Sequence, residues 1–199
     1  MPKLGFFGGS FDPIHNGHVS LALYAIEELS LDKVLLCPAY FAPLRNQKPL
    51  FSSSDRMKMV NSLSKVNKKL KPFDYEVISG KTCYTYETLE VVKRKYPKHE
   101  IIVMLGEDQI SQIQKWKFSR QLIENYSILA FQRSLKNSFD ESFLKSMKKN
   151  INKLGNPLYP HSSTEIRNRI DQGLDISSLV PEPVFNIIKN QFPHNRFST

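Results

Sequence analysis

The stretch GFFGGSFDPIHNGHV, residues 5–19, decides the fold class of this chain. The apolar run Leu4–Phe7 predicts a buried strand, and apolar residues at helical spacing over Val19–Leu29 predict a helix soon after it. Between them, Gly8 and Gly9 carry no Cβ atom, which leaves room for a tight turn and for close approach to the backbone. A strand, a glycine turn and a helix in this order are typical of α/β proteins.

The alternation of strand and helix recurs along the chain. The other apolar runs that predict buried strands are Val34–Cys37, Tyr75–Ile78, Ile101–Leu105 and Ile128–Phe131. Helical spacing is present over Asp55–Leu63 and Tyr86–Val92. We therefore predict one Rossmann-like α/β domain over residues 1–199, built on a mostly parallel, doubly wound sheet. Ligands of such sheets bind at the carboxyl ends of the strands, so we expect the site in the segments that follow them.

The C-terminal part of the chain departs from this alternation. Residues 134–156 are rich in Lys, Asn and Ser, with a helical pattern over Phe139–Met147. Residues 162–190 predict a small helical part made of short helices, which are broken at three positions. These positions are Gly173, Pro181 and Pro183. No repeat or linker separates this part, so we expect it to belong to the same domain.

Length and composition favour a globular protein. The chain has 199 residues, 40% of them hydrophobic, which is enough for a domain with a buried core. No apolar run approaches the length of about 18 residues that a bilayer-spanning helix needs. Met1-Pro2-Lys3 leads directly into the first predicted strand, without the apolar core of a signal peptide. We expect a cytoplasmic protein that makes no membrane contact.

Charge and cysteine content narrow the partners. Cys37 and Cys83 show no spacing typical of a metal site, so we expect buried thiols. The net charge of +9 and the pI near 9.5 favour anionic ligands, but they do not distinguish a nucleotide from a nucleic acid. Much of the excess comes from scattered lysines without a nucleic-acid-binding motif, so we expect no nucleic acid partner. The sequence leaves the oligomeric state open.

Two histidines, His15 and His18, follow the glycine turn and share one face at the start of the predicted helix. Free N–H groups and the dipole at a helix N-terminus attract phosphate, and Ser10 adds a hydroxyl donor. Gly17 leaves room for a ligand against the helix. The segment predicts a phosphate site that is neither a P-loop nor a GxGxxG motif. The alternative is an ordinary glycine turn with two surface histidines.

The segment HSSTEIRNRI, residues 161–170, indicates a second anion site. Ser162 and Glu165 have the spacing of a capping box, which would begin a helix. Hydroxyl groups, N–H groups and the guanidinium of Arg167 could then converge on phosphate oxygens. Taken alone, the segment is explained equally well as an ordinary helix start.

Both motifs resemble those of one superfamily. GGSFDPIHNGHV is similar to the HxGH signature of the nucleotidyltransferases, and HSSTEIR is similar to their ISSTxxR segment. LVPEPV, residues 179–184, resembles the end of the bacterial nicotinate mononucleotide adenylyltransferase branch. The resemblance implies an ATP site completed by residues 162–190, with His15, His18 and Arg167 as catalytic residues. The full set implied to bind ATP is Gly8, Gly9, Ser10, Phe11, His15, His18, Gly106, Asp108, Ser163, Thr164 and Arg167.

Further segments resemble the mononucleotide side of the same family. CYTYETL, residues 83–89, is similar to its SYTxDTL, where the Tyr-Thr region receives the nicotinate carboxylate, and LGEDQI, residues 105–110, is similar to its LGxD. Trp116 matches a position that stacks on the pyridine ring. The residues implied to bind the mononucleotide are Arg45, Tyr84, Thr85, Trp116 and Arg133. The ordinary alternatives are a helix start, an N-cap at Asp108 and core packing of Trp116.

Three positions depart from the family pattern. Leu44 and Cys83 stand where the family has His and Ser, and His161 stands where it usually has Ile. The effect of these departures is open, as is the role of residues 134–160, where the resemblance is thin.

The resemblance implies adenylyl transfer from ATP to nicotinate mononucleotide, which gives deamido-NAD and pyrophosphate in NAD biosynthesis. A substrate phosphate is already an anionic nucleophile, so the protein needs no catalytic base and instead supplies donors that stabilise charge at the α-phosphate. The implied metal is Mg²⁺ carried by the ATP phosphates, with no site of protein ligands. The alternatives are nicotinamide mononucleotide or phosphopantetheine as the acceptor, and a basic binding protein without activity.

Overall fold

The computed structural model describes residues 1–42, 48–132 and 151–193. Within them, six parallel strands form one sheet in the order β3-β2-β1-β4-β5-β6. The strands are β1 (Lys3–Gly9), β2 (Lys33–Pro38), β3 (Leu70–Pro72), β4 (Glu100–Gly106), β5 (Ser127–Phe131) and β6 (Ile151–Leu154). This order, with helices between successive strands from β1 to β5, confirms the predicted doubly wound α/β class.

The helices connect the strands and form the C-terminal part. They are α1 (Asn16–Glu28), α2 (Ser53–Ser62), α3 (Tyr75–Ser79), α4 (Thr85–Lys95), α5 (Glu107–Ile110), α6 (Ser119–Asn125), α8 (Ser163–Asp171) and α9 (Glu182–Gln191), with short 3-10 turns η1 (Leu63–Lys65) and η2 (Ile113–Lys115). Predicted helices over Val19–Leu29, Asp55–Leu63 and Tyr86–Val92 are thereby confirmed. None of the helices in the described ranges is both long and apolar enough to cross a bilayer.

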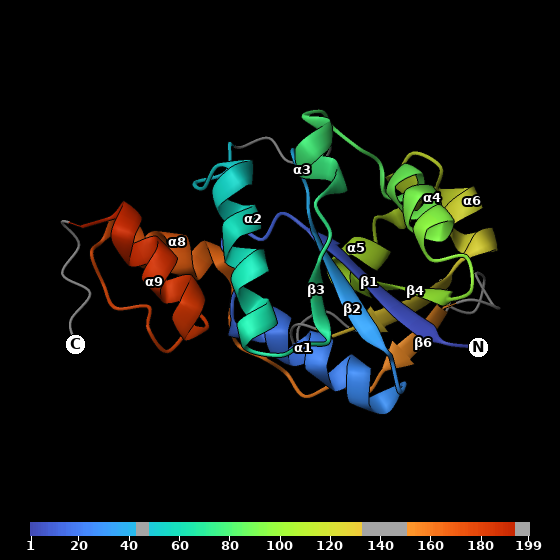
Figure 1. Cartoon of the computed structure of the whole chain (residues 1–199). Helices are drawn as coiled ribbons and strands as arrows, with labels where there is room; N and C mark the ends of the chain where they lie inside the picture. Colours follow the sequence, from blue (N-terminus) through green and yellow to red (C-terminus); the bar gives the residue numbers. More distant parts are fainter. Residues whose placement is uncertain (43–47, 133–150, 194–199) are drawn as a thin grey trace.

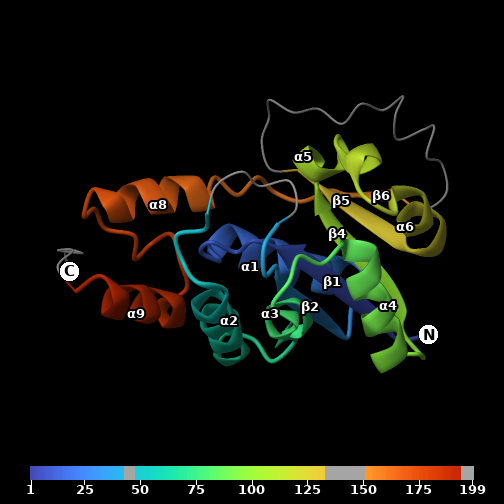
Figure 2. The same cartoon turned by 90° about the horizontal axis from the view of Figure 1, so that it is seen from above.

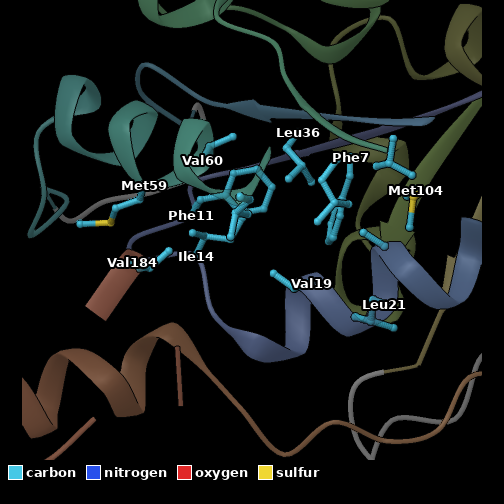
Figure 3. Close-up of a cluster of buried hydrophobic side chains, with 14 of the residues drawn as sticks. Phe7, Phe11, Ile14, Val19, Leu21, Leu36, Met59, Val60, Met104 and Val184 are labelled. Atoms are coloured by element: carbon cyan, nitrogen blue, oxygen red, sulfur yellow. The ribbon is translucent and has the colours of Figure 1, made fainter. Parts of the chain in front are cut away.

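Both faces of the sheet are covered. Side chains alternate along each strand, so Phe7 joins the core under α1 and α2, whereas its neighbour Phe6 joins a second core under α4 and α6. Figures 1 and 2 show α1 and α2 on one side of the sheet and α4 and α6 on the other. In Figure 3, Leu36 and Met104 point from the strands toward Val19 of α1. Burial on both faces explains why the central strands read as continuous apolar runs.

The C-terminal helices lie together at one end of the molecule, away from the N-terminus (Figure 1). Helix α9 packs against α2, and Val184 of α9 enters the same core as Met59 and Val60 of α2 (Figure 3). Helix α8 ends before Gly173, whose φ is +68°, as predicted. Pro183 does not break a helix, because it lies in the first turn of α9, where its missing N–H costs no hydrogen bond.

At the edges of the sheet one predicted strand is wrong and two strands, β3 and β6, were not predicted. Tyr75–Ile78 is wrong as a strand, because these residues form helix α3, and the strand at this edge is β3. An apolar run this short has no periodicity that separates a strand from a helix. Strand β6 was not predicted, since two of its four residues are exposed and polar. The helical pattern over Phe139–Met147 lies outside the described residues.

Candidate active site

A cavity of about 580 Å³ opens at the carboxyl ends of β1 and β4. The chain order reverses between these two strands, which is where open α/β sheets bind ligands. The cavity lining includes Gly8, Gly9 and Ser10 from the end of β1 and, across from them, residues of α4, α5 and the segment after η2. This cavity therefore lies where the site is predicted, at the segments that follow the strands.

The two histidines of the first motif lie side by side at the start of α1. Their ring centres are 3.7 Å apart, and both side chains are buried. The backbone N–H of His15 donates to Nδ1 of His18 over 3.3 Å, so a neutral His18 ring carries its proton on Nε2. The His18 ring packs against Phe11, with centres 5.1 Å apart. These contacts rule out the alternative of two surface histidines.

The protein's own side chains crowd Gly17. A Cβ atom built on Gly17 would lie 3.1 Å from the His15 ring and 3.4 Å from Cβ of His161. The ring of His161 is nearly parallel to that of His15, at 19° and with centres 6.3 Å apart. The space predicted for a ligand beside Gly17 is thus taken mainly by the His15 ring, with His161 in ordinary contact beside it.

Helix α8 is attached to the loop that follows β1. Ser163 Oγ donates to the carbonyl oxygen of Pro13 at 2.9 Å, and Arg167 Nη1 donates to that of Asp12 at 2.8 Å. Arg167 Nη2 donates to Thr164 Oγ1 at 3.1 Å. The second motif therefore reaches the first, which brings the guanidinium to the side of the molecule where the two imidazoles lie.

The capping box at the start of α8 is half formed. Ser162 Oγ accepts a hydrogen bond from the backbone N–H of Glu165 at 3.1 Å, as the spacing predicts. The Glu165 carboxylate instead accepts from Nε of Arg169 at 3.2 Å. The helix cap and the predicted anion site use different side chains. Ser162 caps the helix, whereas Ser163 and Arg167 donate to the loop after β1.

The segments that resemble the mononucleotide side of the family line the same cavity. Tyr84 and Thr85 begin α4, Trp116 follows η2, and all three line the cavity. Trp116 is only partly buried, so its ring is not confined to core packing. Lys117 Nζ lies 4.4 Å from the centre of the Tyr84 ring, which adds a cation to the same wall. This wall combines an aromatic face, N–H and hydroxyl donors, and positive charge.

Gly106, at the end of β4, and Asp108, in α5, lie in different surroundings. Gly106 is buried and caps α5, and its N–H donates to Gln109 Oε1 at 3.2 Å. Asp108 lies in the first turn of α5 and lines the cavity with an exposed side chain. The N-cap alternative for Asp108 is wrong, because Gly106 is the N-cap of α5 and Asp108 lies in the first turn, where it borders the cavity.

Comparison with known proteins agrees with this geometry. The cytidylyltransferase-like family matches residues 6–169. A protein of Clostridium tetani named "Probable nicotinate-nucleotide adenylyltransferase" is 36% identical over 198 residues, covering 95% of this chain and 97% of its own. A protein of the same name from Dictyoglomus thermophilum is also 36% identical, covering 94% and 97%. This chain belongs to the nicotinate-nucleotide adenylyltransferase family.

A solved structure shows the same fold at lower identity. The nicotinic acid mononucleotide adenylyltransferase of Plasmodium falciparum complexed with NaAD superposes with a TM-score of 0.75. It is 21% identical and covers 100% of this chain and 99% of its own. The adenylyltransferase fold is therefore retained over the whole described sheet and its helices.

A buried carboxylate adjoins the cavity of this adenylyltransferase-family chain. Glu76 lines the cavity with a buried side chain, and Thr88 Oγ1 donates to its Oε1 at 2.8 Å. Burial raises the pKa of Glu76 to about 7, against the opposing effect of hydrogen bonds from Thr88 and Cys37. Burial, with Glu76 nearby, also raises the pKa of the Cys37 thiol well above its usual value. Cys37 and Cys83 are both buried free thiols, as predicted.

Two residues that shape the site were not predicted. Arg56 of α2 is buried and donates to the carbonyl oxygens of Ser10 at 2.6 Å, Ala39 at 2.7 Å and Tyr40 at 3.0 Å. Asp12, in the loop after β1, accepts from the N–H groups of Leu50 and Phe51 through its carboxylate. For Arg56 a signal exists, because Arg56, Met59, Val60 and Leu63 are spaced to share one helix face.

Three positions of the predicted site, Arg45, Arg133 and Leu44, lie outside the described residues. Phe11 is buried, so a role in binding ATP would use its backbone. Within the described ranges, no group of three His, Cys, Asp or Glu side chains is placed to hold a metal ion.

Proposed function

We propose that this protein transfers the adenylyl group of ATP to nicotinate mononucleotide, giving deamido-NAD and pyrophosphate. One structural relationship carries the proposal. The segment over residues 8–13, from the end of β1 into the loop after it, lines the cavity at its first residues and contacts α8 at its last. A nucleotide bound along this loop would reach the imidazoles and the guanidinium with its phosphates while its α-phosphate faces the cavity.

The reaction needs positioning and charge stabilisation. A phosphate oxygen of the mononucleotide attacks the α-phosphorus of ATP, the bond from that phosphorus to the bridging oxygen breaks, and pyrophosphate leaves with its electron pair. No proton must be removed from the nucleophile. His18 Nε2 would donate to the α-phosphate, and Arg167 with Thr164 would bind the β- and γ-phosphates. Ser163 would join them by turning its single O–H from the Pro13 carbonyl oxygen to a phosphate oxygen.

Mg²⁺ would accompany the triphosphate and screen its charge. Since the described residues offer no cluster of three metal-ligating side chains, phosphate oxygens and water would supply the ligands. The proposed partners are ATP and the mononucleotide. We also propose that the protein acts in the cytoplasm and binds no nucleic acid.

On the acceptor side, Trp116 would stack on the pyridine ring, and Tyr84 and Thr85 would receive the carboxylate. Asp108 would accept from ribose hydroxyls. Arg45 and Arg133 stay proposed mononucleotide-binding residues on the sequence pattern alone.

An acceptor panel tests the proposal. Purified protein is incubated with ATP and either nicotinate mononucleotide, nicotinamide mononucleotide or phosphopantetheine, and pyrophosphate release and the nucleotide product are measured. We expect product with the nicotinate acceptor at a kcat/KM at least about tenfold above the others, which is one well-placed charged interaction. A higher value for another acceptor would reassign the substrate. Absence of pyrophosphate release with all three would favour the binding protein.

A further inference from the structure

A third imidazole lies beside the HxGH pair. His161 immediately precedes Ser162, the N-cap of α8, and its ring stands 6.3 Å from that of His15 at an angle of 19°. The attachment of α8 to the loop after β1 fixes this approach, because Ser163 and Arg167 both donate to that loop. Cβ of His161 comes within 3.4 Å of the position that a Cβ atom on Gly17 would take, which places His161 against the start of α1.

One ring nitrogen of His161 makes no hydrogen bond within the described residues. Nδ1 of His161 is buried and has no hydrogen-bond partner among the described residues. Burying such a nitrogen without a partner costs free energy, so its position needs an explanation, and a bound ligand that pairs with it is one. His161 is flanked by the two groups of residues that the proposed function assigns to phosphate binding, which are the imidazoles of α1 and the polar side chains of α8.

We propose that His161 is an additional ATP-binding residue, whose imidazole N–H donates to an oxygen of the triphosphate. The proposal rests on the proposed function, because it takes ATP as the nucleotide bound here. The family pattern usually has Ile at this position, and Ile has no donor. In this chain the departure would add a hydrogen bond to a charged acceptor, which is stronger than one between neutral groups.

The competing explanation is packing alone, in which the ring only fills the space above Gly17. Two substitutions separate the explanations. His161→Leu keeps apolar bulk and removes the nitrogens, whereas His161→Asn is smaller but places an N–H donor near the position of Nδ1. A role in packing predicts that Leu is the milder change. A role in hydrogen bonding predicts that Asn is the milder change.

The affinities for ATP with Mg²⁺, for tripolyphosphate and for adenosine are measured by calorimetry without any acceptor. We expect His161→Leu to weaken ATP and tripolyphosphate by about tenfold, the usual size for a hydrogen bond to a charged group, and to leave adenosine within about twofold. His161→Asn should retain ATP within about threefold. His99→Leu is the matched control, because His99 lies just before β4, at the opposite end of the sheet, and should change none of the three affinities.

A second measurement does not depend on the stability of a variant. The ring ¹H and ¹³C signals of His161 in the unaltered protein, assigned by their loss in His161→Asn, should shift on adding tripolyphosphate and not on adding adenosine. Unchanged ring signals, an ATP affinity unaffected by His161→Leu, or equal losses for ATP and adenosine would each overturn the proposal. If ATP binds as expected but no acceptor is adenylylated, the proposed function fails while the assignment of His161 stands.

Discussion

The guanidinium of Arg167 and the backbone of Asp12 are in direct contact across 155 residues of sequence, with Nη1 2.8 Å from the carbonyl oxygen. Nη1 also lies 3.6 Å from Oδ2 of the same residue. The Asp12 carboxylate in turn accepts from the N–H groups of Leu50 and Phe51. One buried aspartate therefore positions a proposed phosphate-binding arginine and holds the segment that enters α2.

Asp12→Asn should damage both roles. The amide keeps one acceptor oxygen but loses the charge and the second acceptor, so we expect a loss of about 2 kcal/mol in the free energy of unfolding. The KM for ATP should rise by about five- to tenfold, because Arg167 is less firmly positioned. Urea unfolding and steady-state kinetics check the two effects. Asp32→Asn, at an exposed carboxylate that accepts one N–H from Lys3, should show neither.

His18→Ala should lower kcat by about a hundred- to a thousandfold, because it removes the donor proposed for the α-phosphate. It should also destabilise the protein by about 1–2 kcal/mol, since the buried ring packs against Phe7 and Phe11. His18→Asn retains an acceptor for the N–H of His15 and tests whether that contact alone supports activity. Activity of either variant within about tenfold of the unaltered protein would remove His18 from the chemistry.

Trp116→Ala should raise the KM for the mononucleotide by about tenfold or more, the usual size of a lost ring-stacking contact. The KM for ATP should change by less than about twofold, since the ring lines the acceptor cavity and lies apart from α8. Trp116→Phe keeps a flat aromatic face and should recover most of the affinity. Equal weakening of both substrates in the alanine variant would show that Trp116 supports the fold and not the ring of the acceptor.

The sequence predicts the central strands because they are buried on both faces, so that β1 and β4 show as uninterrupted apolar runs. It fails at the sheet edges, where β6 is half exposed and where Tyr75–Ile78 is too short for its pattern to exclude a helix. The contributions of Asp12 and Arg56 depend on contacts with residues far along the chain. Local patterns do not contain such contacts, although the spacing of Arg56 places it on an apolar helix face.

Arg56→Met should destabilise the protein by about 3 kcal/mol or more, because it leaves carbonyl oxygens of the loops after β1 and β2 buried without a donor. Those loops border the cavity through Ser10 and Ala39, so the KM for the mononucleotide should rise as well. Urea unfolding provides the first measurement and kinetics the second. Arg94→Met, at an exposed position of α4, should cost less than about 0.5 kcal/mol. A similar small cost at Arg56 would contradict its bridging role.

Glu76 should make the stability of this protein fall as the pH rises from about 4.5 to 7. Its carboxyl has an ordinary pKa of 4.5 in the unfolded chain and a pKa of about 7 when buried, so over this range the folded state holds a proton that the unfolded state has lost. Above pH 7 both states are ionised, and the full cost of the buried charge, about 3 kcal/mol, is present. Below pH 4.5 both are protonated and the cost disappears.

Glu76→Gln removes this titration while keeping an acceptor oxygen for the Thr88 hydroxyl. The variant should therefore gain stability over the unaltered protein at pH 8 and lose that advantage at pH 4.5, as measured by urea unfolding across the range. Glu28→Gln, at an exposed position of α1, changes the net charge equally and should show no such difference. Parallel stability curves for Glu76→Gln and the unaltered protein would mean that this carboxylate, in spite of its burial, is solvated from the cavity beside it.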